Sequence, residues 1–79
     1  MEYTKIMSRL NNIELQYKFY YSSKLKIMRN FLHRELKKFN LEDFAHKYYL
    51  KSVLYRYVRI IQLIQSELDV RMDYVENFL

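Results

Sequence analysis

Apolar residues recur every three or four positions along the first half of the chain, from Tyr3 to Phe39, with a mean step of about 3.6 residues. That step is the period of a straight α-helix, so the pattern predicts one amphipathic helix over about residues 2–39. An alternative is a break at Asn11, because Asn11 followed by Glu14 has the spacing of a capping box. Residues 2–10 would then form a separate short helix.

A second apolar stripe runs from Leu50 to Leu79 with the same mean step of about 3.6 residues. Asn40 separates the two stripes, and Asn often replaces glycine in the left-handed conformation that ends a helix. The segment from Asn40 to Asp43 also places two acids in the first turn of a following helix. We therefore predict a turn near residue 40 and a second helix over about residues 41–79, with a candidate kink at 46–49.

The 79-residue chain contains no glycine and no proline. Tight hairpin turns and glycine-rich phosphate loops are therefore excluded, and an all-α fold remains. We predict a single domain over residues 1–79, built as an antiparallel helical hairpin of two long helices. Such a hairpin places Lys5 near Glu76 and Arg9 near Asp73.

Two helices alone cannot enclose a core, because the conformational entropy of about 1.5 kcal/mol per ordered residue offsets the area buried between them. Each predicted helix also carries a second apolar line beside its main stripe. We therefore predict that two copies form a homodimeric four-helix bundle. Two alternatives are a monomeric three-helix bundle, in which residues 2–10 fold back, and docking of the second line on a larger protein. The predicted oligomer interface consists of Ile6, Ile13, Tyr20, Ile27, Phe31, Val53, Ile60 and Leu63.

The net charge of +5 is unevenly distributed. Residues 1–40 contain nine basic and three acidic residues, whereas residues 41–79 contain five basic and six acidic residues. In the predicted hairpin, Lys51 lies beside Arg29 and Tyr55 lies beside Lys26, so that cations on the two helices form one surface. Such a surface is typical of proteins that neutralise phosphates and stack on bases, although a solvated face, an acidic protein partner or a membrane surface are alternatives. The candidate nucleic-acid-binding residues are Lys18, Lys26, Arg29, Lys37, Lys47, Lys51, Tyr55 and Arg59.

Catalysis and metal binding have little support in the sequence. There is no cysteine, and no serine lies near a histidine at helical spacing. Only His46 has possible ligands at such a spacing, in the acids at positions 42 and 43, and we interpret it and His33 as solvated residues near the turn. We expect no enzyme activity, no metal and no cofactor. Glu14 projects into the apolar stripe, where we expect it to fix the register through a basic partner.

The N-terminal residues lack the apolar segment of a signal peptide, and no apolar run approaches the about 20 residues that cross a bilayer. The sequence thus favours a cytoplasmic protein with no membrane span. We expect a non-catalytic helical protein that self-associates and binds the backbone of DNA or RNA through its basic face. The alternative is a small adaptor or regulatory subunit that binds a larger protein through its exposed apolar strip.

Overall fold

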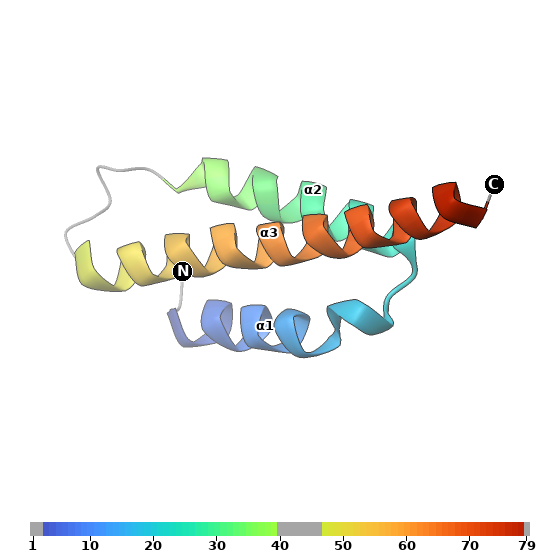
Figure 1. Ribbon diagram of the computed structural model, residues 1–79. Helices are drawn as coiled ribbons and strands as arrows, with labels where there is room; N and C mark the ends of the chain where they lie inside the picture. Colours follow the sequence, from blue (N-terminus) through green and yellow to red (C-terminus); the bar gives the residue numbers. More distant parts are fainter. Residues whose placement is uncertain (1–2, 40–46, 79) are drawn as a thin grey trace.

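The computed structural model describes residues 3–39 and 47–78, and it describes the side chains of residues 4–39 and 51–72. Three α-helices lie side by side along the long axis of the molecule (Figure 1). The elements are α1 (Tyr3–Gln16), a short 3-10 helix η1 (Tyr17–Phe19), α2 (Ser22–Lys38) and α3 (Lys47–Phe78). The predicted all-α fold is confirmed, and the described residues contain no strand. The predicted hairpin of two long helices is wrong, because the first of them is divided into α1 and α2.

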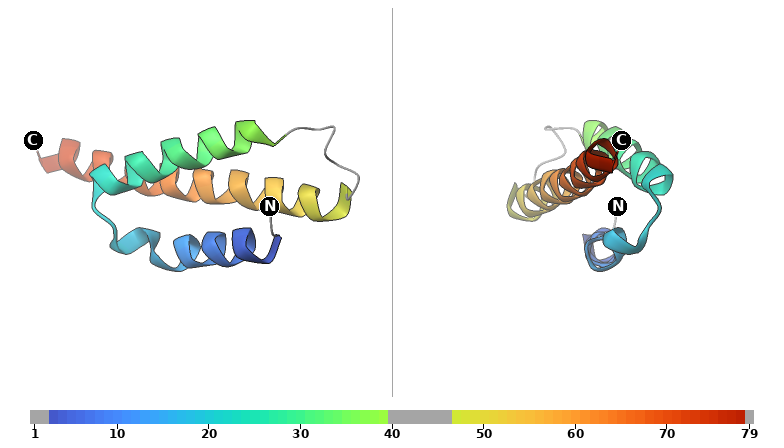
Figure 2. Two further views of the ribbon diagram at one scale, coloured as in Figure 1. Left: turned by 180° about the vertical axis from the view of Figure 1, so that it is seen from behind. Right: turned by 45° about the vertical axis from the view of Figure 1, so that its right-hand side comes forward.

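The helices follow an up-down-up path. α1 and α3 run in the same direction and α2 runs antiparallel to both, as can be followed from the front in Figure 1 and from behind in Figure 2. α3 packs against both α1 and α2, and its last turns extend past the connection between them. The start of α1, the end of α2 and the start of α3 therefore lie at one end of the molecule.

The chain reverses at Tyr20 and Tyr21 and not at Asn11, which lies inside α1. Tyr20 has φ −85° and ψ 146°, and Tyr21 has φ −62° and ψ 153°, so both are extended. No described residue has a positive φ, which explains how the chain reverses without glycine. Phenylalanine and tyrosine are weaker helix formers than the leucine, glutamine and lysine residues that precede them, which makes the run from Phe19 to Tyr21 a suitable place for the break.

Arg71 of α3 holds this connection in place. Its guanidinium donates hydrogen bonds to the carbonyl oxygen of Tyr20 at 2.7 Å and to that of Lys18 at 3.1 Å. It also donates to Ser22 Oγ at 3.3 Å and pairs with Glu67 one turn earlier on α3. One side chain thus satisfies carbonyl groups that the end of α1 and η1 leaves without helical partners.

All three helices contribute to one apolar core, which contains no buried polar residue among those described. The second apolar line that was predicted to form a dimer is largely covered by the chain itself, because α1 folds back on α3. Its members Ile13, Val53 and Ile60 are buried, and Ile6 and Tyr20 pack against the core. Leu63 is half-buried, whereas Ile27 and Phe31 remain exposed. The buried residues are Leu10, Ile13, Leu25, Leu32, Val53, Tyr57, Ile60, Ile61, Ile64 and Leu68.

The register between α2 and α3 also differs from the prediction. Arg29 Nη1 donates to Gln65 Oε1 at 2.7 Å, so Arg29 lies beside Gln65 and not beside Lys51. The predicted neighbours Tyr55 and Lys26 are also separated. Tyr57, two residues after Tyr55, lies near the end of α2, where its ring meets that of Phe39 with centroids 5.4 Å apart. The shift of fourteen residues along α3 corresponds to about 21 Å. α2 ends at Lys38 and α3 begins at Lys47, whereas the prediction placed the turn at a single residue.

The predicted pairs between the chain ends are not formed. Arg9 pairs with Glu35 and Tyr57 in place of Asp73. Lys5 lies near the start of α1, and Glu76 lies near the opposite end of the molecule because α1 and α3 are parallel. The predicted turn at Asn40 lies outside the described residues, and the candidate kink at 46–49 overlaps the beginning of α3.

Candidate nucleic-acid interface

A polar cluster joins the three helices beside the core. Tyr57 of α3 is fully buried, and its hydroxyl donates a hydrogen bond to the carboxylate of Glu35 on α2. Arg9 of α1 forms an ion pair with the same carboxylate and donates from Nη2 to the Tyr57 hydroxyl at 3.0 Å. Each group in the cluster therefore has a polar partner from another helix, as buried polar groups require.

The cluster shifts the ionisation of two of its members. Burial and the hydrogen bond to Glu35 raise the pKa of Tyr57 from 10.0 to about 12, since both disfavour the phenolate. Burial by itself lowers the pKa of Arg9, but its hydrogen bond to Glu35 and the negative charge there raise it above its usual value. At neutral pH Arg9 is therefore charged and Tyr57 is neutral.

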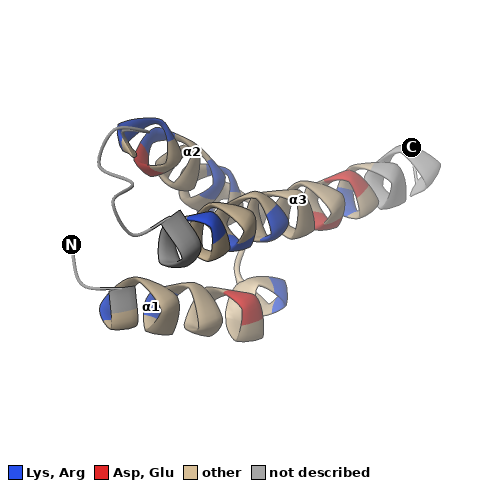
Figure 3. Ribbon diagram, turned by 90° about the vertical axis from the view of Figure 1, so that its left-hand side faces the viewer, with Lys and Arg blue, Asp and Glu red and all other residues tan. Residues whose placement is uncertain are grey.

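This inward position of Glu35 leaves the outer surface of α2 basic. Glu35 is the only acidic residue in α2, and Figure 3 shows a single acidic position among the basic positions of that helix. The five exposed cations of α2 form a surface that we name the basic face of α2. They are Lys24, Lys26, Arg34, Lys37 and Lys38.

No carboxylate of the described residues forms an ion pair with this basic face. Lys24 Nζ lies 4.0 Å from the ring centroid of Tyr20, and the other four cations make no polar contact within the described part of the chain. Their positive charges are therefore available to an anionic partner.

Two cations of α3, by contrast, pair with an acid of α1. Arg59 pairs with Glu14 of α1 at 3.6 Å, and Arg56 pairs with the same carboxylate at 2.6 Å. Glu14 thus has the basic partner that the sequence predicted. Arg56 also donates to the side chain of Asn11. These ion pairs fix the position of α1 on α3 and reduce the positive charge of that side.

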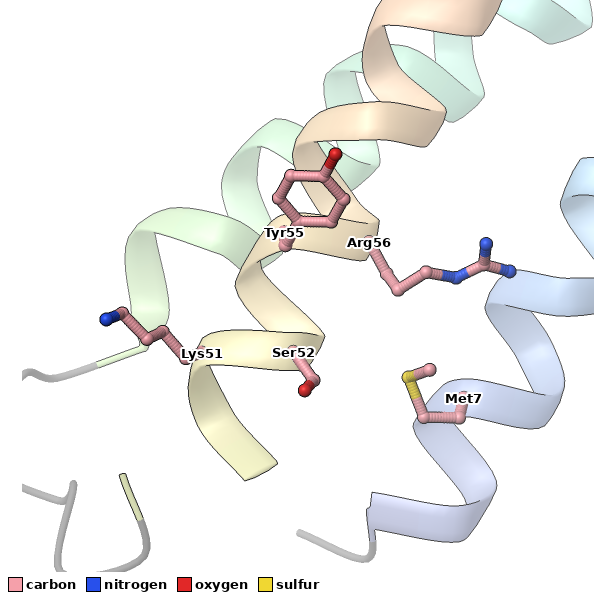
Figure 4. A pocket seen from close by; sticks show the side chains of 5 residues that line it. All are labelled: Met7, Lys51, Ser52, Tyr55 and Arg56. Carbon is pink, nitrogen blue, oxygen red and sulfur yellow. The ribbon is translucent and has the colours of Figure 1, made fainter. Parts of the chain in front are cut away.

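Lys51 and Tyr55 lie at an open groove of about 600 Å³ between α1 and the start of α3 (Figure 4). Arg56 and Ser52 extend from α3 towards α1, where Met7 forms the opposite wall, whereas Lys51 points away from α1. Tyr55 is 70% exposed. The groove thus gathers two cations and one tyrosine, without a carboxylate among its lining residues.

The eight candidate nucleic-acid-binding residues are therefore divided among several surfaces. Lys26 and Lys37 belong to the basic face of α2, and Arg29 is partly buried beside Gln65. Lys18 is exposed on η1, where its carbonyl accepts from Arg71. Arg59, Lys51 and Tyr55 lie on α3, and the side chain of Lys47 lies outside the described residues.

The sequence prediction did not include Lys24, Arg34 and Lys38 in this interface. These residues share a helix face with Ile27 and Phe31, and that face was assigned to the dimer interface. Glu35 was also missed as an inward residue, although it lies three residues after Leu32 and four before Phe39, next to the apolar stripe. That spacing is the feature of the sequence from which the inward position of Glu35 could have been predicted.

The described residues contain no group of three His, Asp or Glu side chains that could hold a metal ion. His33 is exposed on α2, and His46 lies outside the described residues. No described helix is long and apolar enough to cross a membrane. Comparisons with protein families, with curated protein sequences and with solved structures find no significant match to this chain.

Proposed function

We propose that this protein is a non-catalytic helical protein that binds nucleic-acid backbone through the basic face of α2. The observation that carries the proposal is the combination of five exposed cations on α2 with the inward position of Glu35, the only acid of that helix. Lysine and arginine side chains bind phosphates and release counterions from the nucleic acid, which gives an affinity without sequence readout.

The residues of α2 have separate roles in this proposal. Lys26, Arg34, Lys37 and Lys38 contact phosphates, because they make no other polar contact among the described residues. Arg29 has a structural role, because Gln65 and Asn30 already accept hydrogen bonds from its guanidinium. Glu35 supports the interface indirectly, because its contact with Arg9 and Tyr57 fixes which side of α2 faces solvent.

The proposal predicts a steep dependence of binding on salt. With four to five phosphates neutralised, the logarithm of the association constant falls against the logarithm of salt concentration with a slope of about −3 to −4. Replacing Lys26 and Lys37 by Gln reduces that slope by about 1 to 2 and weakens binding to all sequences alike. Fluorescence anisotropy with labelled DNA and RNA oligonucleotides at several salt concentrations measures both effects.

Lys18→Gln together with Lys51→Gln is the matched control, because it removes the same charge from exposed lysines of η1 and α3. The control keeps the slope and the affinity of the parent protein within about twofold. An equal loss of affinity in both double variants shows that binding depends only on the net charge of the protein. A binding constant that does not change with salt concentration contradicts the proposal.

A second proposal concerns protein contacts, and it rests on large apolar side chains that remain exposed near the α1–α2 connection. Leu15, Phe19 and Tyr21 are 76%, 85% and 84% exposed. We propose that self-association uses this surface, since most of the interface predicted from the sequence is buried within one chain. An adaptor that docks on a larger protein, which is a different class of function, would use the same residues. The oligomeric state of the isolated chain distinguishes self-association from the adaptor function.

A further inference from the structure

Two apolar side chains lie exposed among the cations of α2. Ile27 is 67% exposed and Phe31 is 40% exposed. Since the two are four residues apart, they lie on adjacent turns of the same helix face. Lys24 precedes them by one turn, and Arg34 and Lys38 follow them. We name these five residues, Lys24, Ile27, Phe31, Arg34 and Lys38, the exposed strip of α2; it is about 21 Å long.

The charges of this strip do not fit the same strip of a second copy in a two-fold dimer. Two-fold pairing of α2 with another α2 places cations against cations, because the strip has cations at both ends and no acid. Like charges at close range oppose such an interface. The strip therefore requires a partner that is anionic along its length and that also offers apolar surface between its charges.

The ring of Phe31 is held in a defined position. The guanidinium of Arg9 lies over it, 5.5 Å from the ring centroid, and Arg9 is itself fixed by its ion pair with Glu35. A ring that is already oriented loses little side-chain entropy when a ligand stacks on its exposed part. Phe31 thus has the properties of a stacking platform beside two cations.

Single-stranded nucleic acid has the chemistry that matches this arrangement. Its phosphates pair with cations, and its unpaired bases stack on aromatic side chains. A duplex satisfies the cations but keeps its bases stacked inside, so that it offers nothing to Phe31. A membrane surface matches less well, since the continuous apolar face of α2 is buried against α3 and only two apolar side chains remain for insertion.

We propose that the exposed strip of α2 binds single-stranded nucleic acid in preference to duplex, with a base stacked on Phe31 and the flanking phosphates paired with Lys24, Arg34 and Lys38. This inference rests on the function proposed above and names its substrate class. It assigns affinity for any nucleic acid to the cations, and preference for single strands to Phe31.

The test uses Phe31→Leu, with Phe31→Tyr as the conservative variant that keeps a stacking ring. We measure the affinity of each full-length variant for an oligothymidylate, for a duplex of the same length and for vesicles with anionic lipids. The parent protein and Phe31→Tyr prefer the single strand, and Phe31→Leu loses about tenfold in affinity for the single strand with little change for the duplex. Circular dichroism verifies that all variants keep the same helicity.

The chain has no tryptophan, so Phe31→Trp introduces a single reporter at the proposed stacking position. Base stacking quenches its fluorescence on addition of oligothymidylate, whereas Phe19→Trp on η1 is the control that stays unquenched.

Equal loss of single-strand and duplex affinity in Phe31→Leu overturns the preference while the function proposed above stands. Absence of binding to both nucleic acids overturns the function itself. A blue shift of the Phe31→Trp fluorescence with anionic vesicles, without quenching by oligothymidylate, identifies a membrane surface as the partner and overturns the inference.

Discussion

At the scale of single residues, the position of Glu35 has the largest consequence. Its carboxylate accepts from Arg9 of α1 and from Tyr57 of α3, so one side chain of α2 connects all three helices. A partly buried carboxylate of this kind is retained only with good partners, since its removal from water is costly. The same contact removes the only negative charge from the outer surface of α2.

The raised pKa of Tyr57 predicts a loss of stability at high pH. The unfolded chain releases this proton near pH 10.0, whereas the folded protein holds it until about pH 12. The contribution of neutral Tyr57 to the free energy of unfolding is therefore full below pH 10 and falls as the pH rises towards 12, by about 2 kcal/mol. Urea denaturation at several pH values measures this decrease.

Tyr57→Phe is the control for this pH dependence, because it removes the ionisable hydroxyl and keeps the ring in the core. The variant is less stable than the parent protein at neutral pH by about 1 kcal/mol, since Glu35 loses a donor. The difference between the two proteins shrinks as the pH rises above 10, and it reverses sign before pH 12 because the parent protein loses about 2 kcal/mol in that range. A constant difference up to pH 12 shows that the buried hydroxyl does not have the raised pKa.

At the scale of elements, the connection between α1 and α2 determines the fold. Its two extended residues, Tyr20 and Tyr21, allow α1 to return along α3, and Arg71 binds the carbonyl groups on either side of the reversal. The connection thus depends on a residue that lies about fifty positions further along the chain. An isolated segment from residue 3 to 38 has no such donor.

Arg71→Ala tests this dependence. The variant loses about 1 to 3 kcal/mol of stability, because carbonyl oxygens at the connection lose a charged donor. Amide hydrogen exchange, followed by mass spectrometry, accelerates in α1 and η1 more than in α2. Arg34→Ala, which removes an exposed arginine without a polar contact among the described residues, changes the stability by less than about 0.5 kcal/mol. Equal effects of the two variants contradict the role of Arg71.

At the scale of the whole molecule, three helices cover most of the apolar surface that the sequence assigned to a dimer. The accessible surface is 6430 Å², compared with about 5,200 Å² for a compact monomer of this mass. The molecule is elongated, with extents of 52 × 20 × 17 Å. Leu15, Phe19 and Tyr21 are the apolar side chains with the largest exposed fractions among the described residues.

Sedimentation equilibrium tests the proposed self-association. We expect the parent protein to sediment as a dimer, and Leu15→Gln with Phe19→Gln to sediment as a monomer of unchanged helicity, because two exposed apolar side chains are removed without touching the core. Ile27→Gln is the matched control on α2 and keeps the dimer. A monomeric parent protein contradicts self-association and favours the adaptor, whose partner surface stays uncovered.

The sequence by itself determined that the chain is helical, that its two apolar stripes supply most of the core, and that the first half of the chain is basic. The period of 3.6 residues and the absence of glycine and proline are local properties, so they are readable without a fold. The reversal at Tyr20 and Tyr21 was not readable, because Tyr17 and Tyr21 are four residues apart and keep the helical phase across a segment that is not helical.

Only the tertiary structure decided which surfaces remain open. The return of α1 buries Ile13, Val53 and Ile60 within one chain, and the register of α2 on α3 separates Arg29 from Lys51. The same packing decides which cations have no acidic partner among the described residues, since Glu14 and Glu35 form ion pairs with arginines on other helices. These contacts join residues far apart in the sequence, and helical periodicity carries no information about the distances between them.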